Sequence, residues 1–195
     1  MNNTNKDYLD QLSQCITIIP TNYVEALTML HEKLDSLKLK WVVNGALAER
    51  LRLVKVDPDC IEIVTSKEGA EKIYSILQGL ANQEISLQTK QLRNAVIGKV
   101  DYPVFARSYY FELVLNGITV KVEGDLQFKV GEWDWGEVFD FFPEFVYVTG
   151  KRIAVTPIPI LYDFYSSIGW TDRSERIAAT IKKPVNAKSL GVKLK

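Results

Sequence analysis

Hydrophobic residues recur at helical spacing in two stretches of the chain. From Asn22 to Leu37 the apolar side chains fall three or four positions apart, and a helix cap fits at Thr21 or Asn22. From Ser66 to Leu80 the spacing returns, with Ser66 as the N-cap and Gly79 near the end. Both patterns predict amphipathic helices with one face turned towards the core, and we expect the first to pack on a sheet.

Short apolar runs predict strands between and after these helices. Lys40 to Asn44 and Cys60 to Thr65 are mainly aliphatic, which is typical of buried or half-buried strands. Asn116-Gly117 lies between two alternating runs. This dipeptide is a strong hairpin signal and predicts antiparallel pairing of Tyr109 to Leu115 with Ile118 to Glu123.

The last part of the chain predicts a second hairpin and two helices. Phe145 to Val148 and Arg152 to Val155 flank Gly150 and form the hairpin. Pro157 to Trp170 and Thr171 to Lys182 follow as helices, with prolines in the first turn of one and Thr171 as the cap of the other.

Two parts of the chain have less regular patterns. Residues 81–107 are ambiguous, with strand-like pieces at Ile85 to Leu87 and Ala95 to Ile97. Residues 131–145 concentrate tryptophan, phenylalanine and acidic side chains. Aromatic residues at this density usually fill a hydrophobic core or the boundary between domains. The alternative is an aromatic surface that packs against a base or a sugar.

Composition bounds the size of the core and the class of partner. With 195 residues, of which 47% are hydrophobic, the chain can bury a sizeable core. Lysine plus arginine equals aspartate plus glutamate at 24 each, so no global basic field indicates a nucleic-acid partner. The segment from Lys182 to Lys195 is basic and free of acids, and we interpret it as a frayed tail, with a local binding patch as the alternative.

Cysteine and histidine usage excludes several kinds of site. The chain has Cys15, Cys60 and one histidine, His31, so we expect no disulfide framework, zinc site or catalytic triad. The first residues are polar and no run of about eighteen apolar residues exists. The expectation is a cytoplasmic protein without a membrane partner.

The one spacing that suggests chemistry joins the strand Lys40 to Asn44 to the strand Cys60 to Thr65. Gly45 turns the chain after the first strand, and Ala46 to Leu53 reads as a helix. A helix N-terminus favours phosphate, and a neighbouring carboxylate can hold the divalent cation that accompanies a triphosphate. A turn glycine with no ligand is the competing interpretation.

Alternation along the second strand determines which side chains share a face. Cys60, Glu62 and Val64 are expected on one face. A thiol is a poor ligand for magnesium, which prefers hard oxygen ligands. Asp59 would point away on a regular strand, although Pro58 makes the strand entry irregular and could turn Asp59 towards the site. Glu62 could also be an ordinary solvent-facing residue.

The predicted hairpin supplies the remaining charged candidates. In its second strand Lys121 and Glu123 share a face, and Glu123 is the expected further carboxylate, with Asp125 as a weaker choice. If Lys121 reaches Glu62, its ammonium would neutralise charge that a metal would otherwise balance. A surface cross-strand pair without a ligand is the alternative.

The order strand, glycine, helix, acidic strand, helix and hairpin resembles the minimal nucleotidyltransferase superfamily. That family has Gly-Gly or Gly-Ser between its first strand and helix, and Asp-x-Asp on the next strand; here the positions hold Gly45-Ala46 and Cys60-Ile61-Glu62. The stretch from Thr65 to Ile73 is also similar to an uncharacterised archaeal and bacterial branch. The likeness covers roughly Ala26 to Ile181.

The closing helices extend the resemblance. Ile158 to Tyr165 and Asp172 to Ile177 are similar to the C-terminal helices that lean over the catalytic sheet in this family. The resemblance implies that Arg173 and Arg176 could bind phosphate from there. Ion pairs of these arginines with Asp172 or Glu175 on the helix surface are the alternative.

The resemblance implies an α+β fold, a nucleotidyltransferase-like mixed β-sheet flanked by helices and followed by C-terminal helices. We assign residues 1–156 to the α/β core and residues 157–195 to a C-terminal helical segment with the basic tail, and expect one compact unit.

Two function classes follow from the resemblance. In the first, the protein transfers a nucleotidyl group from a nucleoside triphosphate to an unknown hydroxyl acceptor. The expected Mg²⁺ ligands and catalytic residues are Glu62, Glu123 and Asp59, and the expected nucleotide-binding residues are Asn44, Gly45, Ala46, Lys121 and Arg173. In the second, Cys60 has broken the metal pair and the protein is an inactive module of the same fold that binds a nucleotide or a protein partner.

Overall fold

The computed structural model describes residues 19–35, 37–140 and 142–180. The predicted basic tail from Lys182 to Lys195 lies outside these ranges. In chain order the elements are α2 (Thr21–Asp35), β1 (Trp41–Asn44), α3 (Gly45–Leu51), β2 (Ile61–Thr65), α4 (Lys67–Leu77), the 3₁₀-helix η1 (Gln78–Leu80), β3 (Ser86–Gln91), β4 (Ala95–Ile97), β5 (Val100–Tyr102), β6 (Val104–Leu115), β7 (Ile118–Val130), β8 (Glu144–Val148), β9 (Lys151–Val155), α5 (Ile158–Ser167) and α6 (Thr171–Thr180).

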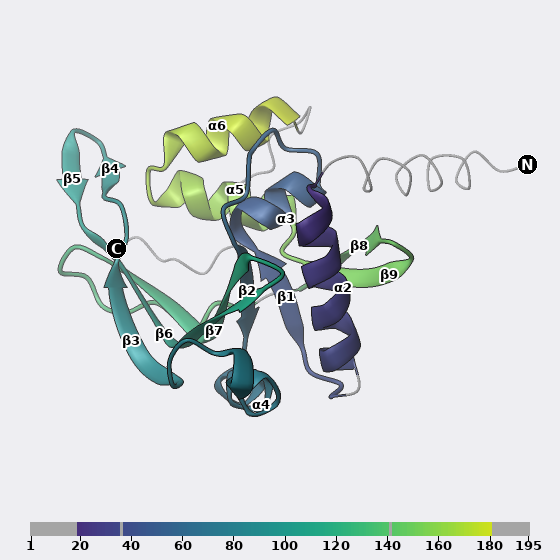
Figure 1. Cartoon of the computed structure of the whole chain (residues 1–195). Helices are drawn as coiled ribbons and strands as arrows, with labels where there is room; N and C mark the ends of the chain where they lie inside the picture. Colours follow the sequence, from purple (N-terminus) through teal and green to yellow (C-terminus); the bar gives the residue numbers. More distant parts are fainter. Residues whose placement is uncertain (1–18, 36, 141, 181–195) are drawn as a thin grey trace, which may run out of the picture.

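Seven strands form one mixed sheet in the order β3-β6-β7-β2-β1-β9-β8 (Figure 1). The pairs β2–β7 and β1–β9 are parallel, and the other neighbouring pairs are antiparallel. β4 and β5 form a separate two-stranded hairpin. The expected α+β fold with a mixed sheet is therefore confirmed.

Alternation along the central strands separates two faces of the sheet. Val43, Ile63 and Val122 belong to the main core, which also contains the buried side chains of α2 and α4. Val42 and Val64 belong to a second, smaller cluster with Ala106 and Leu126. Because Glu62 alternates with Ile61 and Ile63, it lies on the face of this smaller cluster.

The Asn-Gly hairpin is confirmed. Asn116 and Gly117 both have positive φ angles, 50° and 75°, as a tight turn between twisted strands requires. The pairing of Leu115 with Ile118 extends to Val104 with Val130, with a register shift between Arg107 and Tyr109. The two strands are thus much longer than the sequence pattern predicted.

The predicted helix over residues 66–80 is present as α4 followed by η1. The Ser66 hydroxyl accepts a hydrogen bond from the Gly69 amide at 3.1 Å, which confirms Ser66 as the N-cap. The carboxylate of Asp125 accepts a second bond from the Lys67 amide at 2.9 Å. Asp125 therefore caps a helix.

The two closing helices pack together (Figure 1) and contribute to the main core. Ile158, Leu161, Tyr165, Trp170 and Ile177 are buried in the same cluster as residues of α2 and β2. The assignment of residues 157–195 as a separate segment stays a prediction. In the described part of the chain, no helix combines the length and the apolar character that crossing a membrane needs.

Candidate functional site

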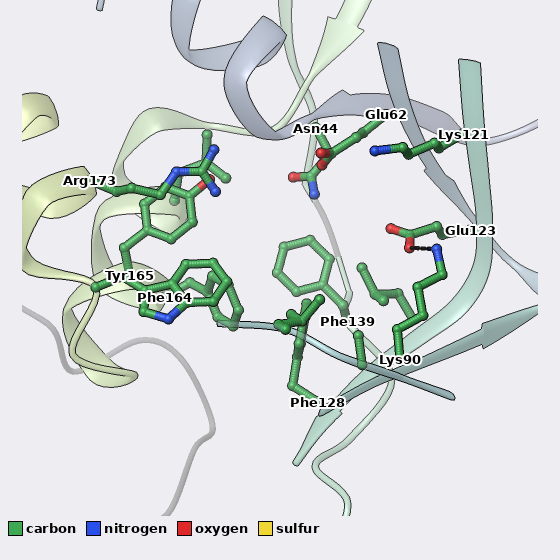
Figure 2. Close-up of a pocket in the computed structure, with 15 residues that line it drawn as sticks. Asn44, Glu62, Lys90, Lys121, Glu123, Phe128, Phe139, Phe164, Tyr165 and Arg173 are labelled. Carbon is green, nitrogen blue, oxygen red and sulfur yellow. Dashed lines mark ion pairs between the residues drawn. The ribbon is translucent and has the colours of Figure 1, made fainter. Parts of the chain in front are cut away.

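A cavity of about 250 Å³ opens between the sheet and the closing helices (Figure 2). Polar side chains from β1, β2, β3 and β7 line one part of it, namely Asn44, Glu62, Lys90, Lys121 and Glu123. Apolar and aromatic side chains line the rest, with Arg173 of α6 on the far side in Figure 2. The cavity lies on the sheet face of the smaller apolar cluster, because Leu126 and Phe128 belong to both.

The bend after β1 touches the Glu62 carboxylate. Gly45 has a φ of +62°, and a Cβ atom added there would lie 2.3 Å from Glu62 Oε2. Glycine is therefore required twice, for the backbone conformation and for the space. The structure brings the predicted bend and the predicted acid together, although neither Gly45 nor Ala46 is among the described residues that line the cavity.

Asn44, Glu62 and Lys121 form a row across three adjacent strands. Asn44 is opposite Glu62 in the β1–β2 pair, and Glu62 is beside Lys121 in the β2–β7 pair. The amide oxygen of Asn44 accepts a hydrogen bond from Thr156 Oγ1 at 2.9 Å. α3 has only seven residues, so its helix dipole is small. Lys121, beside Glu62 on the next strand, supplies a full positive charge.

Glu123 lies further along β7 on the same face and is 14% exposed. Its carboxylate is 3.9 Å from Lys90 Nζ of β3, the ion pair drawn in Figure 2. Burial, together with the negative charge of Glu62, raises the pKa of Glu123 to about 7. Two carboxylates thus face one cavity and repel each other, with Lys90 and Lys121 opposing that repulsion.

Cys60 separates Asp59 from Glu62. The thiol donates to Asp59 Oδ1 at 3.3 Å and lies 3.9 Å from Glu62 Oε1. Burial and the charge of Glu62 raise the pKa of Cys60 to about 12, so the thiol stays protonated near neutral pH. Asp59 is exposed and does not line the cavity; the irregular entry turns its carboxylate towards Cys60.

A buried carboxylate that the sequence did not reveal fixes Arg173. Glu49 of α3 is fully buried, and its carboxylate lies 3.3 Å from the Arg173 guanidinium and 4.0 Å from that of Arg176. The hydroxyl of Tyr165 donates to it at 3.1 Å. Burial raises the pKa of Glu49, and the two arginines and the Tyr165 hydroxyl oppose that rise.

The alternative that Arg173 and Arg176 form surface ion pairs with Asp172 or Glu175 is wrong, because both arginines pair with Glu49. Asp172 instead forms an ion pair with Arg93, from the segment between β3 and β4. The sequence carries one weak signal for Glu49, which is a charged residue in the short and mainly apolar run from Leu47 to Leu51. In the structure every residue of this run except Arg50 is buried.

Three phenylalanine rings from different elements form the aromatic wall of the cavity. Phe128 of β7 and Phe164 of α5 have ring centroids 4.5 Å apart. Phe139, from the aromatic loop, lies 6.4 Å from Phe128 and 6.5 Å from Phe164. Of the other aromatic residues in that loop, Trp133 packs against Tyr102 and Trp135 lies under Arg107.

No protein-family model matches the chain, and no curated protein matches it. Among solved structures, a presumed nucleotidyltransferase from Thermotoga maritima, TM1012, is similar over 84% of this chain and 95% of its own, with 24% identity and a TM-score of 0.66. The chain therefore has a nucleotidyltransferase-like fold.

Two antibiotic-modifying enzymes are more distant matches. The lincosamide adenylyltransferase LnuA, solved with lincomycin bound, has 11% identity and a TM-score of 0.49, over 82% of this chain and 96% of its own. ANT(2″)-Ia, solved with adenylyl-2″-tobramycin, has 11% identity and a TM-score of 0.46, over 82% and 89%.

Proposed function

We propose that the protein transfers a nucleotidyl group from a nucleoside triphosphate to a hydroxyl acceptor, with Glu62 and Glu123 holding a divalent cation. The observation that carries this proposal is the convergence of Glu62, Glu123 and Lys121 on one cavity, beside the bend at Gly45. The nucleotidyltransferase-like fold supports it, although fold alone does not determine function.

The carboxylates fit a Mg²⁺ ion that also binds phosphate. Mg²⁺ in nucleotide enzymes is commonly held by one or two carboxylates together with phosphate oxygens and water. Burial and the charge of Glu62 raise the pKa of Glu123, and a cation held by Glu62 and Glu123 would offset the repulsion between the two carboxylates. When bound, the ion would neutralise charge on the triphosphate.

Cys60 and Asp59 are not part of this proposed ligand set. The Cys60 thiol is protonated and is a soft donor, and Asp59 lies outside the cavity lining. No group of three or more acidic, cysteine or histidine side chains is placed to hold an ion by itself in the described ranges. Phosphate oxygens are thus expected to complete the coordination.

The protein's own residues bind and orient the reactants. Lys121 and Asn44 would contact phosphate oxygens beside Glu62, and Arg173 would contact anionic groups from the opposite side. The acceptor oxygen bonds to the α-phosphorus as the bond to pyrophosphate breaks, and the hydroxyl proton is released to water. Catalysis would come mainly from positioning and charge neutralisation.

Calorimetry with ATP, CTP and GTP, each with and without Mg²⁺ or Mn²⁺, tests the proposal. We expect metal-dependent binding that weakens at least tenfold in Glu62→Gln. Glu71→Gln is the matched control, because Glu71 is an acid on α4, outside the cavity lining, and pairs with Lys67. A protein that binds no triphosphate under any metal condition contradicts the proposal.

The variant Cys60→Asp separates an active site from a degenerate one. It restores the carboxylate that the family motif has at this position. If the natural protein binds triphosphate and the variant binds it with similar affinity, the two-carboxylate site is sufficient. If only the variant binds, the natural chain is the non-catalytic module, and transfer of label from an α-³²P triphosphate should then be undetectable in the natural protein.

A further inference from the structure

We propose that the aromatic part of the cavity holds the acceptor, and that the acceptor is a hydroxyl compound with a flat apolar ring and no positive charge. This inference rests on the proposed function and deepens it by naming the substrate class. Two features of a single cavity carry it. Three half-buried aromatic rings line one part of the cavity, and an excess of arginine over carboxylate lies on the far side.

The rings of Phe128, Phe139 and Phe164 surround one side of the open volume (Figure 2). Each is only partly buried by the protein, although their centroids are within 6.5 Å of one another. Leu126 and Leu161 are nearly fully buried beside them. An apolar ring that enters this space would be covered on several sides, and each aromatic contact adds to the free energy of burial.

Carboxylates are confined to the other part of the cavity. Of the described side chains that line it, only Glu62 and Glu123 are acidic, and both would be engaged by the cation and its triphosphate. An ammonium that enters the aromatic part loses the water around it, which is costly where no carboxylate replaces that water. The aromatic part offers no carboxylate, and the attraction of ring faces for a cation offsets only part of the cost.

The charge on the far side of the cavity is positive. Arg173 and Arg176 share one carboxylate, that of Glu49, so this cluster keeps an excess of one positive charge. The Arg173 side chain is 24% exposed and lines the cavity, above the rings of Tyr165 and Trp170. Arg173 would attract an anionic group on the acceptor and repel an ammonium.

Two probes with the same ring and hydroxyl group test the inference. We would measure binding of 6-hydroxy-2-naphthoate and 6-aminomethyl-2-naphthol to protein saturated with Mg²⁺ and α,β-methylene-ATP. The naphthoate should bind at least tenfold more tightly than the amine. Arg173→Gln should reduce this preference to less than threefold.

Phe139→Ala should weaken naphthoate binding at least fivefold and leave the affinity for the triphosphate analogue unchanged. Phe139 belongs to a loop, so this change is compatible with folding, and Phe164→Leu provides a second test within α5. Phe145→Ala is the control, because Phe145 is 42% exposed on β8 and does not line the cavity.

The outcomes separate the two proposals. If the triphosphate analogue binds but the naphthoate does not bind, or binds no better than the amine, the acceptor inference is wrong and the proposed function stands. If the naphthoate and the analogue compete, the rings hold the nucleobase and the inference is again wrong. If no triphosphate binds, both proposals fall.

Discussion

At the scale of single residues, Gly45 connects the backbone bend to the position of the Glu62 carboxylate. An added Cβ would meet the end of a flexible side chain, Glu62 Oε2, at 2.3 Å. The easiest relief is therefore a movement of the carboxylate, which changes the site more than the fold.

We expect Gly45→Ala to weaken metal-dependent triphosphate binding at least tenfold, measured by calorimetry. The loss of stability should be about 1–2 kcal/mol, because alanine is disfavoured at a positive φ. Gly150→Ala is the matched control, since Gly150 has a φ of +77° and an added Cβ there would meet nothing within 4 Å. Equal loss of affinity in the two variants would contradict the role given to Gly45.

Glu123 should make stability depend on pH. Its pKa is raised from 4.5 to about 7 in the folded protein, so the folded chain holds this proton more tightly than the unfolded chain. The resulting stabilisation is complete below pH 4.5 and is lost as the pH rises through about 7.

Glu123→Gln removes the ionisation. Its free energy of unfolding, from urea denaturation, should match that of the natural protein at about pH 4 and exceed it by up to about 3 kcal/mol at pH 8. Parallel pH profiles for the two proteins would contradict this assignment.

The sequence predicted which face of the sheet carries the side chains of Glu62, Lys121 and Glu123, because alternation along a strand is a local property of the backbone. It did not predict the burial of Glu49, because that depends on α6 placing Arg173 and Arg176 over α3. Lys90 was missed for a similar reason, since it reaches Glu123 only through the pairing of β3 with β6.

At the scale of elements, Glu49 links α3 to α6. Glu49 itself is fully buried, and removing its charge leaves Arg173 and Arg176 without their shared carboxylate. Glu49→Gln should lower the free energy of unfolding by roughly 3 kcal/mol, measured by urea denaturation.

Asp172→Asn provides the control on the same helix. The side chains of Asp172 and Arg93 are 59% and 50% exposed. The loss in the free energy of unfolding should therefore stay under about 1 kcal/mol. Similar losses for Glu49→Gln and Asp172→Asn would show that the buried link adds no more than a surface ion pair.

Elements with strong local signals were predicted best. The hairpin at Asn116-Gly117 and the cap at Ser66 depend on neighbouring residues alone. Of β3 only the start gave a strand-like signal, at Ile85 to Leu87, because it is an edge strand whose side chains are exposed or half-buried.

At the scale of the whole molecule, the closing helices and the sheet share one core. Trp41 of β1 and Trp170 after α5 both belong to it. Urea unfolding followed by tryptophan fluorescence and by far-ultraviolet circular dichroism should therefore give coincident transitions. Two separated transitions would instead support independent folding on either side of residue 156.

The mixed sheet and the closing helices that lean over it could be expected from the resemblance, whereas the aromatic and Lys90 walls of the cavity could not. These walls require β3 beside β6 and the aromatic loop folded back so that the Phe139 amide donates to the Leu126 carbonyl at 2.7 Å. Neither of these long-range contacts has a local sequence signal.

The distance along the chain between Asn44 and Arg173, which face the same cavity, has a consequence for synthesis. Strands and early helices can pair while the polypeptide is still emerging from the ribosome, but the side of the cavity that carries Arg173 is missing until α6 has been released. A nascent chain stalled before α6 should thus not be retained on a triphosphate resin that captures the finished protein.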